Sequence, residues 1–167
     1  MSAALVLPDR FRDAEHLEEV MTTPAPELVA ELGQVEGDII ILGVGGKIGP
    51  TLAQLAKRAA PSRRVIGVAR FSEAGLRERL SAHGIECHEA DLLDRRQIDS
   101  LPKASNVIFM AGRKFGSSGA EDLTWAMNAH VPALVAEAFA ASRIVAYSTG
   151  CVYPYVCLLY TSDAADE

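Results

Sequence analysis

Apolar residues follow two alternating patterns along the chain. Continuous runs such as 39–42 are typical of strands buried on both faces, whereas 52–59 carries apolar residues at helical spacing. Because the two patterns alternate from residue 38 onward, they predict an α/β fold with a doubly wound parallel sheet and helices on both faces. The predicted strands are 39–42, 65–69, 85–90, 106–111 and 143–148, and the main predicted helices are 52–59, 72–83 and 123–141.

Residues 1–36 precede this alternation and predict a helical N-terminal extension. A first helix is expected over 11–21, and Thr23 is a candidate cap for a second helix that Gly33 and Gly37 end. Both helices have an apolar side, so we expect the extension to pack on the domain formed by 37–156. The pattern gives the extension no chemical role.

The last eleven residues, 157–167, resemble the translation of a transposon-type sequencing adapter. A natural acidic terminus is the alternative interpretation. If the adapter interpretation holds, 157–167 is a non-native tail and the natural reading frame continues after Val156. The domain over 37–156 is then incomplete after its fifth strand.

A glycine-rich segment, Gly43-Val-Gly-Gly-Lys-Ile-Gly49, follows the first predicted strand and opens a helix. The spacing is G-x-x-G-x-x-G, which differs from that of a phosphate-binding P-loop. Gly43 permits a sharp turn, Gly46 leaves space for a pyrophosphate, and Gly49 allows the helix to pack closely. The free N–H groups of the helix start attract phosphate. The context favours dinucleotide binding over the alternative of a glycine-rich turn without a ligand.

Composition and charge argue against several other classes of function. Hydrophobic residues make up 49% and charged residues 23%, and the net charge is −6 without a basic stripe, which argues against a nucleic-acid partner. No apolar run is long enough to cross a membrane and no signal peptide is evident, so we expect a cytoplasmic protein. The three cysteines do not have the regular spacing of a disulfide framework, which indicates reduced thiols. His83, Cys87 and His88 share no face, so no metal site is predicted.

Several further segments, in order along the chain, resemble signatures of the extended short-chain dehydrogenase/reductase family, within its NAD-dependent epimerase/dehydratase group. After the glycine segment come 90–94 (Ala-Asp-Leu-Leu-Asp), 109–114 (Phe-Met-Ala-Gly-Arg-Lys), Asn128 and 147–154 (Tyr-Ser-Thr-Gly-Cys-Val-Tyr-Pro). The likeness runs from about Asp38 to Pro154 and implies a Rossmann-type fold.

The resemblance implies roles for individual residues. Asp91 would bond the adenine amine, the turn after the fourth strand would lie beside the cofactor ribose, and Thr149 would take the catalytic Ser/Thr position. Asp91 as a helix cap and Asn128 as a structural bridge are the alternatives. The predicted cofactor-binding residues are Gly43, Gly46, Lys47, Ile48, Gly49, Ala69, Arg70, Asp91, Leu92, Ala111, Gly112, Lys114, Asn128 and Ser148.

The family's Tyr-x-x-x-Lys pair has no counterpart in the sequence. Tyr153 and Tyr155 lack a lysine four residues later, and Pro154 replaces the usual glycine. We therefore expect the 167-residue chain by itself to be without dehydrogenase or epimerase activity.

The end of the second strand bears on the choice of cofactor. An acidic residue there binds the ribose 2′-OH of NAD, whereas arginine accommodates the 2′-phosphate of NADP. Here Ala69 is followed by Arg70, which favours NADP over NAD. The alternative is that Arg70 is solvated or stacks on adenine with either cofactor.

Two functions follow for the parent protein. The first is an NAD(P)-dependent epimerase, dehydratase or reductase that acts on a nucleotide sugar or a similar carbonyl or hydroxyl substrate. The second is a non-catalytic dinucleotide-binding sensor or partner-binding module. The partners expected are a dinucleotide and a small-molecule substrate, and a homodimer is compatible with the sequence.

Overall fold

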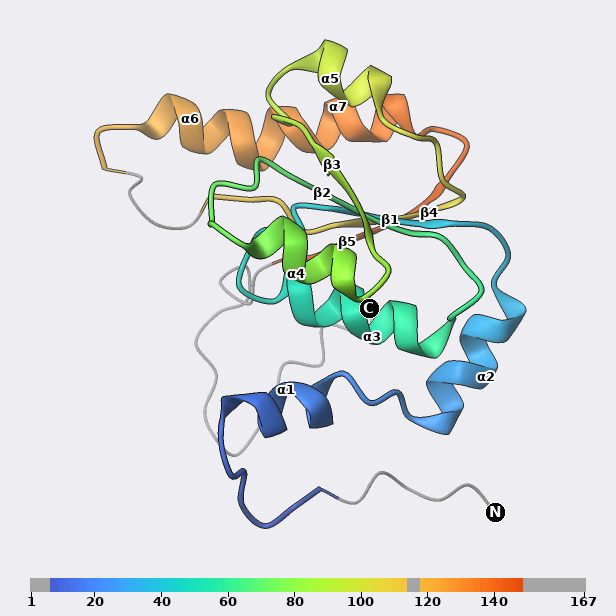
Figure 1. The fold of residues 1–167 in the computed structure, drawn as a ribbon. Coiled ribbons are helices and arrows are strands. Elements are labelled where there is room, and N and C mark those ends of the chain that lie inside the picture. Colours follow the sequence, from blue (N-terminus) through green and yellow to red (C-terminus); the bar gives the residue numbers. More distant parts are fainter. Residues whose placement is uncertain (1–6, 114–117, 149–167) are drawn as a thin grey trace, which may run out of the picture.

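The computed structural model describes residues 7–113 and 118–148. Five strands form an all-parallel sheet in the order β3-β2-β1-β4-β5 (Figure 1). This confirms the predicted Rossmann-type α/β fold. The strands are β1 (Ile39–Leu42), β2 (Val65–Ala69), β3 (Glu86–Glu89), β4 (Asn106–Phe109) and β5 (Arg143–Ala146). The helices are α1 (Ala14–Met21), α2 (Pro26–Gln34), α3 (Gly49–Ala59), α4 (Leu76–Ala82), α5 (Arg95–Ser100), α6 (Glu121–Trp125), the π-helical turn η1 (Ala126–His130) and α7 (Val131–Ala138).

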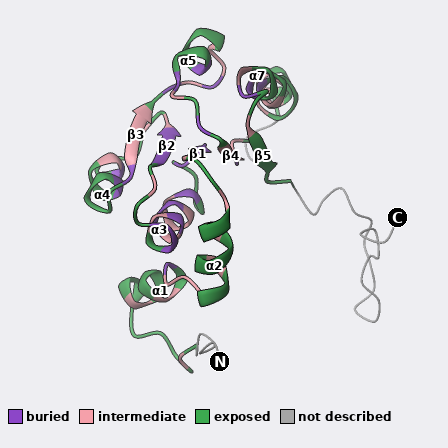
Figure 2. Cartoon of the chain, turned by 90° about the vertical axis from the view of Figure 1, so that its right-hand side faces the viewer, coloured by how far each residue is buried: buried purple, intermediate pink, exposed green. Residues whose placement is uncertain are grey.

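Strand β1 is buried on both faces, as its unbroken apolar run predicts. Ile40 and Leu42 belong to a cluster that includes residues of α5 and α7, whereas Ile39 and Ile41 belong to a cluster that includes residues of α3 and α4. Figure 2 shows this central strand between the two helical layers. Full burial of one such side chain contributes about 1.5–3 kcal/mol, so these two clusters fix the register of the whole sheet.

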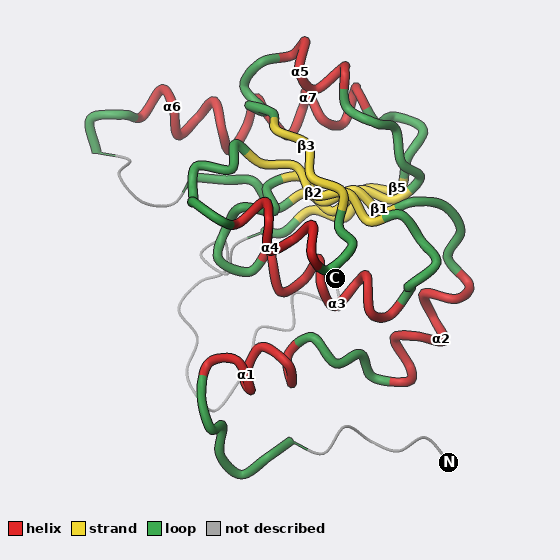
Figure 3. The backbone as a smooth tube through the Cα atoms, in the orientation of Figure 1, coloured by secondary structure: helices red, strands yellow, loops and turns green. Residues whose placement is uncertain are grey.

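The extension contacts the domain through polar groups. Helices α1 and α2 lie against the outer side of α3 (Figures 1 and 3). The guanidinium of Arg58 donates to both carboxylate oxygens of Glu19, at 2.9 and 2.7 Å, and to the hydroxyl of Thr22 at 2.7 Å. Of the apolar residues expected to make the contact, Leu17 and Met21 are exposed, at 37% and 52%, whereas Leu32 of α2 packs against the core cluster that includes α3 and α4. The extension is therefore held by directional polar bonds to α3 together with the packing of Leu32.

Two boundaries in the extension differ from the prediction. Thr23 does not cap α2, because its hydroxyl donates to the carbonyl of Glu19 at 2.7 Å. Helix α2 begins at Pro26 with Ala25 as its N-cap. Gly33 does not end the helix, which continues to Gln34. A capping hydroxyl that turns back to the preceding helix is satisfied there and leaves the next helix without a side-chain cap.

The predicted helix over 72–83 is shorter in the structure. Helix α4 begins at Leu76 after Gly75, whose φ of 77° lies in the left-handed region. The preceding residues form the loop that follows β2. At the other end, Gly84 has a φ of 74°, which is the conformation of a glycine that ends a helix.

The long helix predicted over 123–141 is interrupted. Residues Ala126–His130 form the π-helical turn η1, and the N–H of Val131 bonds the carbonyl of Ala126, five residues earlier. Pro132 explains the interruption, because proline has no N–H to donate and its ring crowds the carbonyl four residues before it. That carbonyl belongs to Asn128, a predicted site residue.

The edge strand β3 carries an ion pair with a pH-dependent contribution to stability. Arg64 donates to Glu86 at 2.5 and 2.7 Å, and His88 also contacts this carboxylate. The hydrogen bonds from Arg64 and then His88 lower the pKa of Glu86 from 4.5 to about 2. Because the folded pKa is the lower one, the contribution is present above pH 4.5 and is lost as the pH falls towards 2.

We expect Glu86→Gln to remove this part of the acid sensitivity. The effect on the free energy of unfolding should stay below about 1 kcal/mol, because both side chains are more than a third exposed and solvent screens the pair. Urea unfolding at several pH values between 2 and 5 tests this. Glu31→Gln on the exposed side of α2 is the matched control and should keep the wild-type slope. An unchanged slope in Glu86→Gln would contradict the assignment.

Candidate functional site

The glycine segment forms a tight loop at the carboxyl end of β1. Gly43 has a φ of 95°, and a Cβ there would lie 2.7 Å from the backbone nitrogen of Ala111, at the end of β4. A Cβ at Gly49 would lie 2.6 Å from the carbonyl carbon of Val44. Both positions therefore require glycine, for a sharp turn and for a close approach of α3 to the loop.

Gly46 differs from its two neighbours in the motif. A Cβ at Gly46 would lie 3.5 Å from its nearest neighbour, the carbonyl oxygen of Gly43, which is ordinary van der Waals contact, so the protein itself leaves room for a side chain there. Packing within the protein does not explain glycine at this position, whereas a ligand against the backbone would. The residues present therefore fit the pyrophosphate of a dinucleotide.

The loop lies where the order of the strands reverses, between β1 and β4. Strand β1 pairs with β2 on one side and with β4 on the other, and the connecting helices lie on opposite faces (Figures 1 and 2). Open α/β sheets bind ligands at this switch point. Helix α3 begins here with no side-chain cap, so its first N–H groups remain to be bonded by a ligand or by solvent.

A cavity of about 260 Å³ opens beside the loop. Its walls come from the segments that follow β1, β2, β3 and β4, together with residues of α4 and η1. The lining residues are Gly43, Gly45, Gly46, Val68, Ala69, Arg70, Phe71, Ser72, Glu73, Leu76, Ala90, Asp91, Leu92, Met110, Ala111, Gly112 and Met127. We call it the loop cavity.

Eight of the predicted cofactor-binding residues line the loop cavity. They are Gly43, Gly46, Ala69, Arg70, Asp91, Leu92, Ala111 and Gly112. Asp91 does not cap α5, because the carboxylate that accepts from the first turn of that helix belongs to Asp94. One carboxylate oxygen of Asp91 accepts from the N–H of Leu93 at 3.0 Å, which fixes the turn after β3.

Five of the other predicted cofactor-binding residues do not line the loop cavity: Lys47, Ile48, Gly49, Asn128 and Ser148. Ile48 is 56% exposed, Gly49 is buried beneath the loop, and Ser148 is exposed just after β5. Lys47 lines a different cavity. Lys114 and Thr149 lie outside the described residues. The cofactor-binding role of these six positions and the catalytic role of Thr149 stay predictions.

Asn128 holds the loop that follows β4. Its side-chain oxygen accepts from the N–H of Arg113 at 2.7 Å, and its amide nitrogen donates to the carbonyl of Arg113 at 2.8 Å. A Cβ at the adjacent Gly112 would lie 3.4 Å from the same side-chain oxygen. Asn128 therefore bridges the π-helical turn and a wall of the loop cavity. Its position is close to the site rather than within it.

Of the loop after β2, the sequence analysis identified only Arg70 as part of the site, whereas Phe71, Ser72 and Glu73 also line the cavity. Phe71 has a φ of 47°, the one positive φ of a non-glycine residue in the described part of the chain. Its ring lies 4.7 Å from the guanidinium carbon of Arg77. Glu73 also lines the cavity and pairs with Arg79 at 3.2 Å. The prediction of a helix start at Ser72 assigned most of this loop to a helix. No pattern in the sequence indicates that Phe71 adopts a left-handed conformation.

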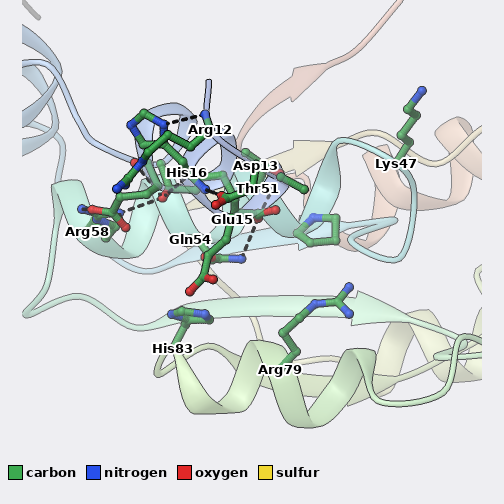
Figure 4. A pocket seen from close by; sticks show the side chains of 15 residues that line it. Arg12, Asp13, Glu15, His16, Lys47, Thr51, Gln54, Arg58, Arg79 and His83 are labelled. Atoms are coloured by element: carbon green, nitrogen blue, oxygen red, sulfur yellow. Dashed lines mark hydrogen bonds and ion pairs between the residues drawn. The ribbon is translucent and has the colours of Figure 1, made fainter. Parts of the chain in front are cut away.

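A second, larger cavity of about 1100 Å³ lies between α1, α3 and α4. Figure 4 shows Arg79 and His83 on one side, facing residues of α1 and α3 across the opening. Residues of α1 and α3 bond to one another in it: Arg58 lowers the pKa of Glu19 through a hydrogen bond, and the neutral amide of Gln54 donates to Glu18 at 3.1 Å. This cavity therefore belongs to the docking of the extension.

Within residues 7–113 and 118–148, no three His, Cys, Asp or Glu side chains are grouped so as to hold a metal ion. No helix in the same ranges has both the length and the apolar character needed to cross a bilayer.

The fold and the site together define a class of protein. A doubly wound parallel sheet, with an open glycine loop at its switch point, is the architecture of dinucleotide-binding α/β proteins. The model of the NAD dependent epimerase/dehydratase family matches residues 39–164, and the chain belongs to this family. The family implies a nicotinamide dinucleotide as cofactor and an oxidoreductase-like function. The match includes part of 157–167, so the adapter origin of that segment stays a prediction.

Solved structures support the same fold. The chain is similar to ADP-L-glycero-D-manno-heptose-6-epimerase from Helicobacter pylori, with 18% identity and a TM-score of 0.64 over 77% of this chain and 44% of that one. It is also similar to L-threonine dehydrogenase from Clostridium difficile, with 18% identity and a TM-score of 0.52 over 60% of this chain and 32% of that one. A search of curated proteins found no match. The chain spans less than half the length of these solved relatives.

Proposed function

We propose that the loop cavity binds NADP or NAD, with a preference for NADP, in an oxidoreductase that acts on a nucleotide sugar or a similar carbonyl or hydroxyl substrate. The observation that carries this proposal is Gly46, whose side-chain position is open although the loop around it is closely packed. The heptose epimerase among the solved relatives acts on a nucleotide-linked sugar by its name, which supports this substrate class.

The cavity offers partners for each part of the cofactor. The pyrophosphate would lie against Gly46 and the first N–H groups of α3. The adenine would lie near Asp91 and Leu92, and its ribose near Ala69 and Arg70. The proposed cofactor-binding set is completed by Gly43, Lys47, Ile48, Gly49, Ala111, Gly112, Lys114, Asn128 and Ser148.

Chemistry would follow on the nicotinamide side of the site. A nicotinamide supplies hydride transfer when it is bound. We assign to Thr149 a hydrogen bond to the reacting oxygen of the substrate. We assign to Asn128 a positioning role, since its side chain fixes the loop at Arg113 beside the cavity.

Calorimetry with NADP and NAD, combined with a hydride-transfer assay, tests the proposal. Binding with turnover supports the oxidoreductase, and binding without turnover would support the sensor instead. If neither NADP nor NAD bound, the assignment of the loop cavity as the cofactor site would be contradicted.

Arg70→Ala tests the choice of cofactor. Loss of a charge-assisted contact to the 2′-phosphate costs about 1.5–3 kcal/mol, so NADP affinity should fall about 10- to 100-fold. NAD affinity should change little. Arg10→Ala removes the same charge from the exposed N-terminal segment and serves as the control. Equal losses for both cofactors would show that Arg70 does not recognise the phosphate.

The division of the chain into three segments is also part of the proposal. We assign 1–36 to a helical extension, 37–156 to the dinucleotide-binding domain and 157–167 to a non-native tail. A cytoplasmic location and a small-molecule substrate for the parent protein remain predictions.

A further inference from the structure

The loop that follows β2 carries two opposite charges beside the loop cavity. Arg70 and Glu73 both line this cavity. The carboxylate of Glu73 accepts from the guanidinium of Arg79, on α4, at 3.2 Å. Arg70 is exposed, and within residues 7–113 and 118–148 its guanidinium makes no ion pair or hydrogen bond. Of the two charges in the loop, only the negative one is therefore neutralised by another residue of the described chain.

The backbone between these two charges is anchored to α4 and β3. Phe71 has a φ of 47° and packs against the buried cluster that includes residues of α3 and α4. The guanidinium carbon of Arg77 lies 4.7 Å from the centre of its ring, and Arg77 also pairs with Glu89 of β3 at 2.8 Å. A bulky residue keeps a left-handed conformation only where its surroundings fix it. The places of Arg70 and Glu73 in the loop are thereby set, and what can change is the partner of each side chain.

We propose that Arg79 is a positioning residue that favours NADP over NAD, because it holds Glu73 away from Arg70 and from the ribose 2′ position. The inference rests on the proposed function of the loop cavity and names the interaction that leaves Arg70 available to the 2′-phosphate. Arg79 projects from α4 and does not line the loop cavity (Figure 4). It therefore acts through Glu73 and not on the cofactor itself.

Release of Glu73 would weaken NADP binding in two ways. Its carboxylate, three residues after Arg70 in the same loop, would be free to pair with that guanidinium and compete with the 2′-phosphate. Its negative charge would also repel the phosphate, whereas a ribose hydroxyl can donate to a carboxylate. NAD has no 2′-phosphate, so neither effect opposes its binding.

Arg79→Met tests the inference, because it removes the charge and keeps an unbranched side chain that suits a helix. NADP affinity in calorimetry should fall about 5- to 10-fold, since one unpaired charge is released near the phosphate in exposed surroundings. NAD affinity should stay the same or rise. The difference from the wild type should shrink as salt is added, because exposed charges are screened. A merely structural role would weaken both cofactors and would not depend on salt in this way.

A second variant examines the route through Glu73. In the Arg79→Met background, Glu73→Gln should restore the wild-type ratio of NADP to NAD affinity, because no carboxylate is left to release. Arg64→Met is the matched control. It removes an arginine from a comparably exposed ion pair, with Glu86, before the start of β2 and so at the other end of that strand from the cavity. This control should leave the ratio unchanged.

The outcomes separate this inference from the proposed function. An unchanged ratio in Arg79→Met, equal losses for both cofactors, or a loss that Glu73→Gln does not restore would overturn the role of Arg79, while dinucleotide binding by the wild-type chain would stand. If the wild-type chain bound neither cofactor, the proposed function would be contradicted and this inference with it.

Discussion

Replacing Gly46 by valine is expected to abolish dinucleotide binding and to leave the fold intact. A Cβ added at Gly46 would lie 3.5 Å from the nearest protein atom, the carbonyl oxygen of Gly43, so the protein has room for the side chain. It would occupy the space that we assign to the pyrophosphate. Affinity for both NADP and NAD should fall at least about 100-fold in calorimetry, because the loss concerns a group that the two cofactors share.

A matched control separates this effect from a general effect of valine for glycine. Gly33→Val changes the same residue types in α2, at a position where an added Cβ meets nothing within 4 Å. That variant should bind both cofactors like the wild type. Thermal unfolding should show that Gly46→Val retains its folded structure. If a folded Gly46→Val bound with unchanged affinity, the cavity would not be the cofactor site.

The opposite outcome is expected at Gly49, where even a methyl group should unfold or strongly destabilise the chain. A Cβ there would lie 2.6 Å from the carbonyl carbon and 2.7 Å from the Cα of Val44. Both are backbone atoms, and Val44 is itself fully buried. The loop can relieve the clash only by moving away from α3. We expect Gly49→Ala to lower the free energy of unfolding by about 3 kcal/mol.

Urea unfolding of Gly49→Ala and Gly33→Ala provides the comparison. The Gly33 variant should be as stable as the wild type or more stable by about 0.5–1 kcal/mol, since alanine is favoured over glycine inside a helix. Equal stability of the two variants would mean that α3 does not depend on its close contact with Val44. Together, Gly46 and Gly49 separate the ligand-binding and structural roles of one motif.

The sequence predicted features that depend on strong local periodicity. The short run 39–42, ending at glycines, indicated a strand buried on both faces, and the glycines indicated the turn and the helix start that follow it. Helix α5 was missed because it has six residues and one buried apolar side chain, Ile98, too few to produce a helical period. The interruption at η1 was missed because the apolar pattern over 123–141 is otherwise that of one continuous helix, so the effect of Pro132 was not considered.

Side-chain partners across the chain were much harder to predict. The bond from Thr23 back to Glu19 overrides its capping preference, and the left-handed Phe71 depends on contacts that sequence spacing does not encode. The same holds for the extension, where Arg58 joins residues 35 to 39 positions away. Local patterns indicated which residues form the elements, and tertiary contacts determined where several of those elements begin.

The π-helical turn has a consequence for how the helix over 121–138 can change. An α-helix advances about 100° per residue, and a π turn holds one residue more than the regular geometry needs. The two halves are thereby set in independent angular phase. Asn128, within the π turn itself, is directed towards the loop at Arg113, while Val131 and Val135 of α7 keep their own phase towards the core. Insertions or deletions of one residue on either side of η1 would therefore rotate one half and spare the other, so that loop geometry and core packing can vary separately.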